Sequence, residues 1–427
     1  MANTSPEQIA RRVLDACLAH QPWDVQDIDT LVDSESDALF HIVAEGLADR
    51  FDPQLTDVYV DIFSHAIARV DDRFTAEELR SHYAHVRRVW PYRYVAPSQQ
   101  RILDAEERAL RSLRTGGAAY RVPGIATPPN RGAEPDPERI VLLSRVTLGA
   151  DIAVTSIVAQ ALQTRFPSSE LLFAGNAKSA ELLGLPLLPI DYPRTGGLRE
   201  RLKAISPIGD LPDDTLIVDP DSRLTQLGMY PIGHNQRRYY FFDSRSVEGP
   251  GSLVELTRDW CAQVFEVDIP WPKITTPPAS FDFDRPAIAV SLGVGGNEAK
   301  RIGGPFEREL LRELSARAAT VILDKGAGDE EAARAEAAAA GLPNVRLFNG
   351  SFAAFAALIA NSDLYVGYDS AGQHAAAALG IPLISVFAGA VNDRFFDRWR
   401  PEGRVLRIDG GSPDSVFFRT RSALPQW

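Results

Sequence analysis

The stretch GYDSAGQHAAAALGIP at residues 367–382 holds small polar side chains at spacings that could bind an anion. Asp369, Ser370 and Gly372 come after an apolar, β-prone run, and His374 lies one turn into an alanine-rich segment that ends at Gly-Ile-Pro, a helix-ending signal. The pattern predicts a strand, a turn and a helix. Backbone N–H groups and the helix dipole favour an anion at such an N-terminus. An ordinary helix cap by Ser370 is the alternative, and this stretch alone leaves it open.

A glycine-rich loop, SLGVGGNEAKR at residues 291–301, follows an apolar strand nearer the middle of the chain. It lacks the third glycine of G-x-G-x-x-G, and it is not a P-loop, so it does not indicate a nicotinamide or ATPase site. Its Gly295, Asn297, Lys300 and Arg301 suit a phosphate or pyrophosphate. A turn followed by solvated charges is the alternative.

Asp151 lies in a third loop, RVTLGADIAVTS at residues 145–156, between a predicted strand and its helix. As structure, an aspartate there is an adequate helix cap. As chemistry, it is a carboxylate that could remove a proton from an acceptor hydroxyl.

The sequence does not predict a metal site. Asp219 and Asp221 form a D-x-D at a strand end, where a metal-binding pair could lie, but no further carboxylate or histidine stands near them. His82 and His85 lack the additional ligands that zinc requires. We therefore expect no metal and no cofactor.

Apolar strands alternate with helices in two series, which predicts two doubly wound α/β domains on parallel sheets. Such sheets bind ligands at the carboxyl ends of their strands, and two facing domains would form a cleft. The predicted order is a helical N-terminal domain (1–126), a linker (127–138), an acceptor-side Rossmann-like domain (139–272), a second linker (273–286) and a donor-binding Rossmann-like domain with a C-terminal tail (287–427).

The chain has 427 residues with 45% hydrophobic and 24% charged side chains, which is ordinary for a globular protein. Its formal net charge of −12 argues against a nucleic-acid partner. The two cysteines, Cys17 and Cys261, indicate no disulfide framework. We find no signal peptide or transmembrane run, so a cytoplasmic location is the expectation.

Three motifs together resemble glycosyltransferase family 9, the ADP-heptose:lipopolysaccharide heptosyltransferases. The family pattern D-[ST]-G-x-x-H-x-x-A-A-L-x-x-P is similar to DSAGQHAAAALGIP, with Ala371 at the glycine position. A loop rich in Gly or Ser that ends in Lys-Arg is similar to GVGGNEAKR. The opening R-L-x-x-x-G-D-V is similar to RVTLGADI. The resemblance covers residues 139–410.

The resemblance implies a GT-B fold and a metal-independent, inverting transfer of heptose or a related hexose from a nucleotide-diphosphate donor. It implies that Asp151 is the general base. It also implies a cradle for the donor diphosphate, in which His374 orders the diphosphate as negative charge grows on it. The residues implied for this cradle are Lys300, Arg301, Asp369, Ser370, Ala371, Gly372 and His374.

Several alternatives stay open. The family offers a carboxylate to the donor ribose from a helix where this chain has Ala353 and Ala354, so the nucleobase is undecided and ADP is one choice. Rival interpretations are a protein or natural-product glycosyltransferase of the same family, a nucleotide-sugar 2-epimerase, and a catalytically decayed scaffold. The epimerase corner has a pair of glutamates where this chain has His374 and Ala375, which favours transfer.

The acceptor is expected in the middle domain, at Arg223, His234 and Arg237, which could meet an anionic group. A carbohydrate, a glycolipid or a protein would each serve as acceptor. The N-terminal helices could bind a partner. Arginines and aromatic residues interleave at 87–101, which favours a seam between domains and leaves peripheral membrane contact as the alternative.

Overall fold

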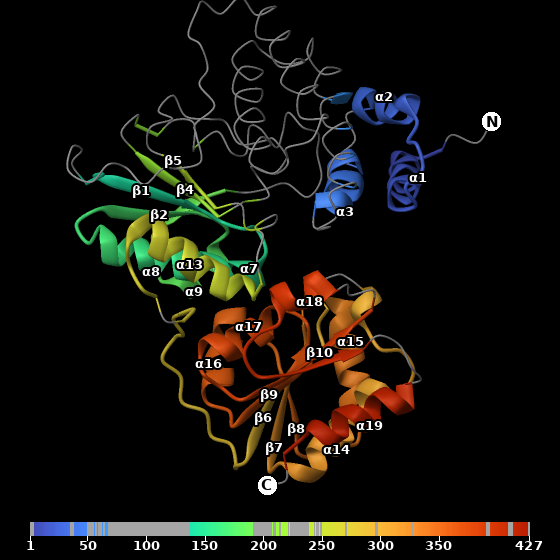
Figure 1. Ribbon diagram of the computed structural model, residues 1–427. Coiled ribbons are helices and arrows are strands. Elements are labelled where there is room, and N and C mark those ends of the chain that lie inside the picture. The colour runs from blue at the N-terminus through green and yellow to red at the C-terminus, as the bar shows by residue number, and fades with distance from the viewer. Residues whose placement is uncertain are drawn as a thin grey trace, which may run out of the picture. The chain divides into compact units, whose positions relative to one another are not determined.

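The computed structural model describes residues 4–34, 38–48, 136–190, 250–269, 271–294, 298–326, 328–389, 393–408 and 413–425, with shorter pieces between 55 and 66 and between 207 and 247. The chain divides into two compact units (Figure 1). Unit 1 comprises residues 1–146, 166–176 and 186–248, and unit 2 comprises 147–165, 177–185 and 249–427. This division crosses the predicted segment 139–272, whose boundaries stay a prediction.

Unit 1 contains a five-stranded sheet with the order β3-β2-β1-β4-β5 and only parallel pairs. The central strands of this sheet are mostly buried, as expected for a parallel sheet, whereas the edge strand at 187–189 is largely exposed. The chain builds one half of this sheet outward from β1 and the other half outward from β4, so these two neighbours form its switch point. The strands are β1 (Arg139–Leu143), β2 (Glu170–Gly175), β3 (Leu187–Pro189), β4 (Leu216–Asp219) and β5 (Tyr239–Phe241).

Unit 2 contains a six-stranded parallel sheet with the order β11-β10-β9-β6-β7-β8. The chain builds one half outward from β6 and the other half outward from β9, so these neighbours form the topological switch point. The loops after them emerge side by side, which is where doubly wound sheets bind ligands. The strands are β6 (Ala287–Ser291), β7 (Thr320–Asp324), β8 (Val345–Phe348), β9 (Leu364–Tyr368), β10 (Leu383–Ala388) and β11 (Arg404–Ile408).

Helices cover both faces of this second sheet (Figure 1). One face packs on α14 (Phe306–Arg317), α15 (Asp329–Ala339) and α19 (Pro413–Ala423). The other packs on α16 (Phe352–Ala360) and α17 (Ala371–Ala378). Alternate residues serve the two faces, since successive side chains of a strand point in opposite directions. The predicted α/β fold with parallel sheets is thus confirmed.

Unit 2 also holds several elements that precede its sheet in the sequence. Ile152 and Leu182 belong to the same apolar cluster as α16 and α17. The predicted helix over 151–166 is built from a π-helical turn followed by an α-helix. The elements are α7 (Leu148–Ala150), η3 (Asp151–Thr155), α8 (Ser156–Arg165), α9 (Ala177–Leu183) and α13 (Leu253–Phe265).

The described N-terminal residues are helical. α1 (Pro6–Leu18) buries Ile9, Val13 and Cys17 and begins with a capping box at Ser5. α2 (Val25–Asp33), η1 (Leu39–Ala44) and α3 (Glu45–Ala48) follow. Residues 67–135 lie outside the described part, so the predicted all-helical domain over 1–126 stays a prediction beyond these elements.

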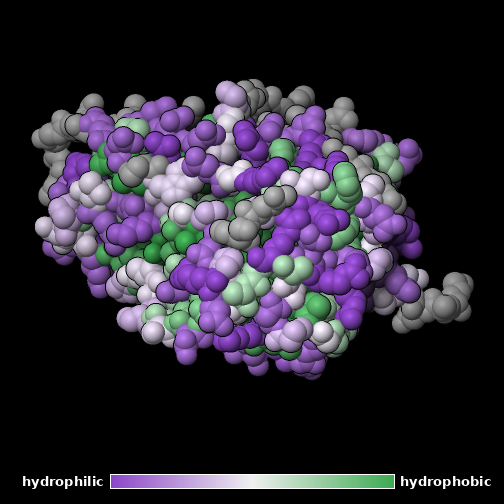
Figure 2. Space-filling model, turned by 90° about the horizontal axis from the view of Figure 1, so that it is seen from below, coloured by the Kyte–Doolittle hydropathy of each residue, from purple (hydrophilic) through white to green (hydrophobic). Residues whose placement is uncertain are grey.

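Most side chains on the face drawn in Figure 2 are hydrophilic, and hydrophobic ones form small groups among them. Large exposed hydrophobic residues in the described part of the chain are few, and Phe418 of α19 is the most exposed of them. In the same part, each helix is too short or too polar to span a membrane.

Two glycines allow Tyr365 of β9 to lie under the strand–helix corner. A Cβ on Gly372 would overlap the Tyr365 hydroxyl, and one on Gly367 would lie 2.5 Å from it. The hydroxyl is fully buried and has no hydrogen-bond partner of normal geometry in the described residues, although Ser291 and Ser370 lie nearby. The glycines are therefore a packing requirement of the corner.

We predict that Gly372→Ala destabilises the protein by about 1–3 kcal/mol, because the added methyl group is forced against Tyr365. Helix propensity alone would give the opposite sign. Adding Tyr365→Phe, which removes the overlapped oxygen, should recover part of the loss. Urea unfolding measures all three, with Gly303→Ala as the control because nothing lies within 4 Å of a Cβ there. Equal effects of the two alanine substitutions would contradict this account.

Candidate functional site

The corner predicted from the sequence forms where β9 ends at Tyr368 and α17 begins at Ala371. Ser370 occupies the N-cap position in an extended conformation, but its side chain makes no capping hydrogen bond. The interpretation of Ser370 as an ordinary side-chain cap is therefore wrong. Helix geometry leaves the first N–H groups of α17 without partners inside the helix, and such groups favour an anion.

Lys300 crosses the switch point to reach this corner. It ends η5 (Glu298–Lys300), in the loop after β6. Its Nζ lies 2.8 Å from Asp369 Oδ2 and 3.2 Å from the Asp369 carbonyl oxygen. The Asp369 side chain is 7% exposed and that of Lys300 is 23% exposed, so the ion pair is largely removed from water. Lys300 thus brings a positive charge beside the start of α17.

A buried hydrogen-bond network continues from Asp369 into α17. Gln373 Nε2 lies 2.6 Å from Asp369 Oδ1 and 3.2 Å from His374 Nε2. The Gln373 amide oxygen accepts a hydrogen bond from Ser385 of β10. The structure thus brings together Lys300, Asp369 and His374 as predicted, and adds Gln373 and Ser385, which the sequence analysis did not identify.

His374 is buried in unit 2, and two uncharged residues contact its ring. Its ring meets Trp399 of α18 (Asp393–Trp399) edge-on at 5.9 Å between ring centroids. A Cβ on Gly149 of α7 would lie 3.1 Å from His374 Cδ2. Burial lowers the pKa of His374 to about 4, with Asp369 opposing this shift and Lys300 adding to it. The imidazole is therefore neutral at physiological pH.

Asp151 lies at the first residue of η3, which packs against α17 within unit 2. It is 1% exposed. Thr155 Oγ1 donates to Asp151 Oδ1 at 2.9 Å, and Ser179 Oγ donates to Oδ2 at 2.7 Å. A single π-helical turn often marks a functional position in a helix. An acceptor hydroxyl would reach this carboxylate only after side chains around it move.

Arg301 turns away from the corner, although it follows Lys300. Its guanidinium group lies 2.9 Å from Glu298 Oε2 and 2.6 Å from Glu307 Oε1, and it donates to the Leu292 carbonyl oxygen. Arg334 of α15 lies 2.8 Å from the same Glu298 oxygen. The predicted role of Arg301 on the diphosphate stays a prediction, and in this structure the side chain lies among carboxylates.

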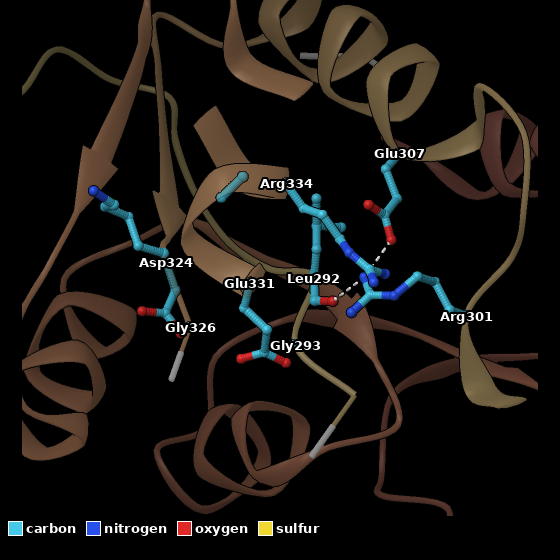
Figure 3. A pocket seen from close by; sticks show the side chains of 10 residues that line it. Leu292, Gly293, Arg301, Glu307, Asp324, Gly326, Glu331 and Arg334 are labelled. Atoms are coloured by element: carbon cyan, nitrogen blue, oxygen red, sulfur yellow. Dashed lines mark hydrogen bonds and ion pairs between the residues drawn. The ribbon is translucent and has the colours of Figure 1, made fainter. Parts of the chain in front are cut away.

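Arg301, Glu307 and Arg334 line a small polar pocket at the carboxyl ends of β6 and β7 (Figure 3). In Figure 3 the Glu331 carboxylate points toward Gly293 and Gly326. A Cβ on Gly326, whose φ is +76°, would overlap that carboxylate. Burial raises the pKa of Asp324, a hydrogen bond from Gly326 opposes this, and Glu331 adds to it. The pocket therefore presents carboxylate oxygens beside glycine backbone.

The pocket carboxylates were missed by the sequence analysis, which looked for a ribose-binding carboxylate on the segment that forms α16. Asp324 ends a buried strand, and Glu331 lies in the first turn of the helix that follows it. Acidic residues at the carboxyl end of a strand and in the next helix turn were the available signal.

Most of the remaining predicted site residues are not described by the structure. Gly295, Asn297, Arg223, His234 and Arg237 lie outside the described residues. Of the D-x-D pair, Asp219 is fully buried and accepts a hydrogen bond from the Ser222 backbone, whereas its partner lies outside the described part. Among the described residues, no group of three His, Cys, Asp or Glu side chains is placed to hold a metal ion.

Unit 2 thus carries, at the switch point of its parallel sheet, a helix N-terminus of the kind that favours an anion. Residues 249–415 match the sequence model of Glycosyltransferase family 9 (heptosyltransferase). The resemblance predicted from the sequence is thus confirmed over these residues, and with it the prediction of a glycosyltransferase.

Similar solved structures include E. coli heptosyltransferase WaaC with ADP-2-deoxy-2-fluoro heptose, at 15% identity and a TM-score of 0.47 over 67% of this chain and 100% of that one. E. coli ADP-heptose lps heptosyltransferase II has 19% identity and a TM-score of 0.47 over 67% of this chain and 98% of that one. The glycosyl transferase family 9 protein from Veillonella parvula DSM 2008 has 14% identity and a TM-score of 0.47 over 68% and 90%. No curated protein matches the chain.

We predict that His374 makes folding less favourable as the pH falls from 6.5 toward 4. The unfolded histidine takes up a proton near pH 6.5, whereas the folded one does so near pH 4, because burial lowers its pKa. The loss should reach about 1.4 kcal/mol per pH unit within this window. Urea unfolding across the window should show a steeper fall for the wild type than for His374→Gln. Parallel curves would mean that His374 titrates normally.

Proposed function

We propose that the protein is an inverting, metal-independent glycosyltransferase that needs no cofactor. It moves heptose or a related hexose from a nucleotide-diphosphate donor, with ADP one candidate, to a hydroxyl of a carbohydrate, glycolipid or protein. The observation that carries this proposal is the Lys300–Asp369 pair beside the start of α17, at the switch point of the sheet.

The corner suits the diphosphate of the donor. When the sugar leaves, the bond to the diphosphate breaks and negative charge grows on its oxygens. The N–H groups of Ala371 and Gly372 at the start of α17 and the Lys300 ammonium group favour that charge in a site largely removed from water. Since Lys300 balances the charge of Asp369, the positive potential left for the diphosphate comes from the N–H groups of the helix N-terminus, which bind an anion without a divalent cation.

Asp151 is the proposed general base. Its carboxylate accepts hydrogen bonds from Thr155 and Ser179, which hold it in one orientation. An acceptor hydroxyl would reach this group once the side chains around it have moved, because Asp151 is buried. The proton passes from the acceptor to Asp151 as the new glycosidic bond forms.

The pocket beside the corner suits the nucleoside. The hydroxyls of a ribose are donors, and the carboxylates of Asp324 and Glu331 are acceptors in a site where Asp324 is largely buried. The basic side chains of the same lining, Arg301, Lys325 and Arg334, are each paired with a carboxylate, so a phosphate there would have to compete with these ion pairs. We therefore assign the ribose to the pocket and the diphosphate to the corner.

The assembled corner argues against a decayed scaffold. Replacing a buried ion pair with well-packed hydrophobic residues often leaves a protein equally stable. Stability alone therefore does not explain why the chain has the buried Lys300–Asp369 pair. Binding of a nucleotide separates the two interpretations.

We predict that one nucleoside diphosphate binds without Mg²⁺ and that Lys300→Met weakens this binding by about 2–5 kcal/mol, since it leaves Asp369 unpaired beside the ligand. Titration calorimetry with ADP, GDP, UDP and 2′-deoxy-ADP, in EDTA and then in Mg²⁺, measures it. Lys178→Met, an exposed lysine of α9, is the matched control. Binding only in Mg²⁺ would contradict the metal-independent mechanism, and no binding to any nucleotide would favour the scaffold.

We predict that Asp151→Asn slows transfer by about 10²–10⁴-fold while nucleotide affinity changes little, because the amide cannot accept the proton. Release of the nucleoside diphosphate from its nucleotide sugar, with water or the acceptor as nucleophile, measures the rate. Asp219→Asn replaces another buried aspartate and serves as the control. Equal losses in both variants would assign Asp151 a structural role.

A further inference from the structure

Gln373 is a fully buried side chain whose hydrogen bonds connect three other buried groups. Its amide nitrogen lies within hydrogen-bond distance of Asp369 and His374, and its amide oxygen accepts from Ser385. It lies one residue before His374 in α17 and one turn after Asp369. The proposed function assigns it no role.

The chemistry of the neighbours determines which way the amide points. Asp369 is ion-paired with Lys300 at 2.8 Å, so its carboxylate is ionised and can only accept hydrogen bonds. The Gln373 atom 2.6 Å from Asp369 Oδ1 must therefore be the NH₂ nitrogen. The amide oxygen then faces Ser385, whose hydroxyl can donate to it.

The same nitrogen determines the tautomer of His374. An amide nitrogen has no lone pair to accept a hydrogen bond, so at 3.2 Å it donates to His374 Nε2. Nε2 must carry the lone pair, and the single proton of a neutral imidazole is then on Nδ1. A doubly protonated ring would place an N–H group against an N–H group.

The surroundings of the His374 ring together favour its neutral form. Lys300 opposes a positive imidazole, whereas Asp369 favours it, and burial outweighs both. Gly149 and Trp399, which contact the ring from α7 and α18, carry no charge. The Asp151 carboxylate on η3 accepts hydrogen bonds from side chains other than His374.

We propose that Gln373 is a positioning residue that holds His374 as the neutral Nδ1–H tautomer, so that His374 serves the donor diphosphate as a hydrogen-bond donor and never as an acid. This proposal rests on the proposed function of the corner. A nucleoside diphosphate leaves without taking up a proton, since its terminal phosphate titrates near pH 6. Lys300 then provides a positive charge beside the diphosphate, and His374 provides a hydrogen bond that orients it.

The test is the tautomer of His374 in the full-length protein labelled with ¹⁵N-histidine. The chain has seven histidines, and His374→Gln assigns the signal. Long-range ¹H–¹⁵N spectra should show protonated Nδ1 and unprotonated Nε2, unchanged from about pH 5.5 to 8.5. An Nε2–H tautomer, or titration of His374 within this range, would overturn the proposal.

Two variants separate positioning from packing. Gln373→Glu places a carboxyl oxygen beside Asp369 Oδ1, so these two carboxyl groups should share one proton and His374 Nε2 should lose its donor. His374 should then become protonated at Nε2 and titrate within the range, and transfer should gain a new acid limb in its pH profile. Gln373→Met keeps the volume without hydrogen bonds, so His374 should lose its single tautomer without becoming charged. An unchanged His374 spectrum in folded Gln373→Glu would overturn the proposal. The wild-type spectrum is decisive even where a variant does not fold.

The spectra need no nucleotide, so this test and the nucleotide titration fail independently. A wild-type Nδ1–H tautomer without any nucleotide binding would refute the proposed function of the corner. Nucleotide binding to a protein whose His374 titrates normally would refute only the role of Gln373.

Discussion

The ion pair between Lys300 and Asp369 is the interaction on which the site depends. Asp369 follows β9 directly, so without a partner its buried carboxylate would lie beside the start of α17 and compete with any incoming anion. Lys300 engages one carboxylate oxygen and Gln373 engages the other. The negative charge of Asp369 is thus compensated locally, and the helix N-terminus can attract a ligand.

The sheet topology makes this pair possible. Lys300 and Asp369 are far apart in the sequence, but β6 and β9 are neighbours because the chain reverses its direction of building between them. The loops after these two strands must then emerge together. Gly372 lets Tyr365 fill the space beneath the corner, so the position of the helix start is set by packing as well as by charge.

The alternation of strands and helices could be predicted because buried parallel strands are short apolar runs bounded by turn residues. That Lys300 and Asp369 belong to one site was implied only by the family resemblance, and the structure adds that the two side chains form an ion pair. The role of Gln373 could not be predicted, since it depends on a contact with Ser385 across to another strand. The burial of Asp151 could not be predicted either, because it depends on Ser179 from a separate helix.

The corner and the pocket of unit 2 differ in their charged groups, and this difference bears on which part of a nucleotide each would accept. The corner offers Lys300 and a helix N-terminus. The neighbouring pocket offers carboxylates and three basic side chains that are already paired with carboxylates, namely Arg301, Lys325 and Arg334. A diphosphate placed in the pocket would face Glu331, but a ribose there would find acceptors for its hydroxyls. The net charge of −12 does not oppose an anionic donor, since charges farther away than about 10 Å are largely screened by salt. The local pairing of each carboxylate, and not the net charge, therefore determines where in unit 2 an anion is favoured.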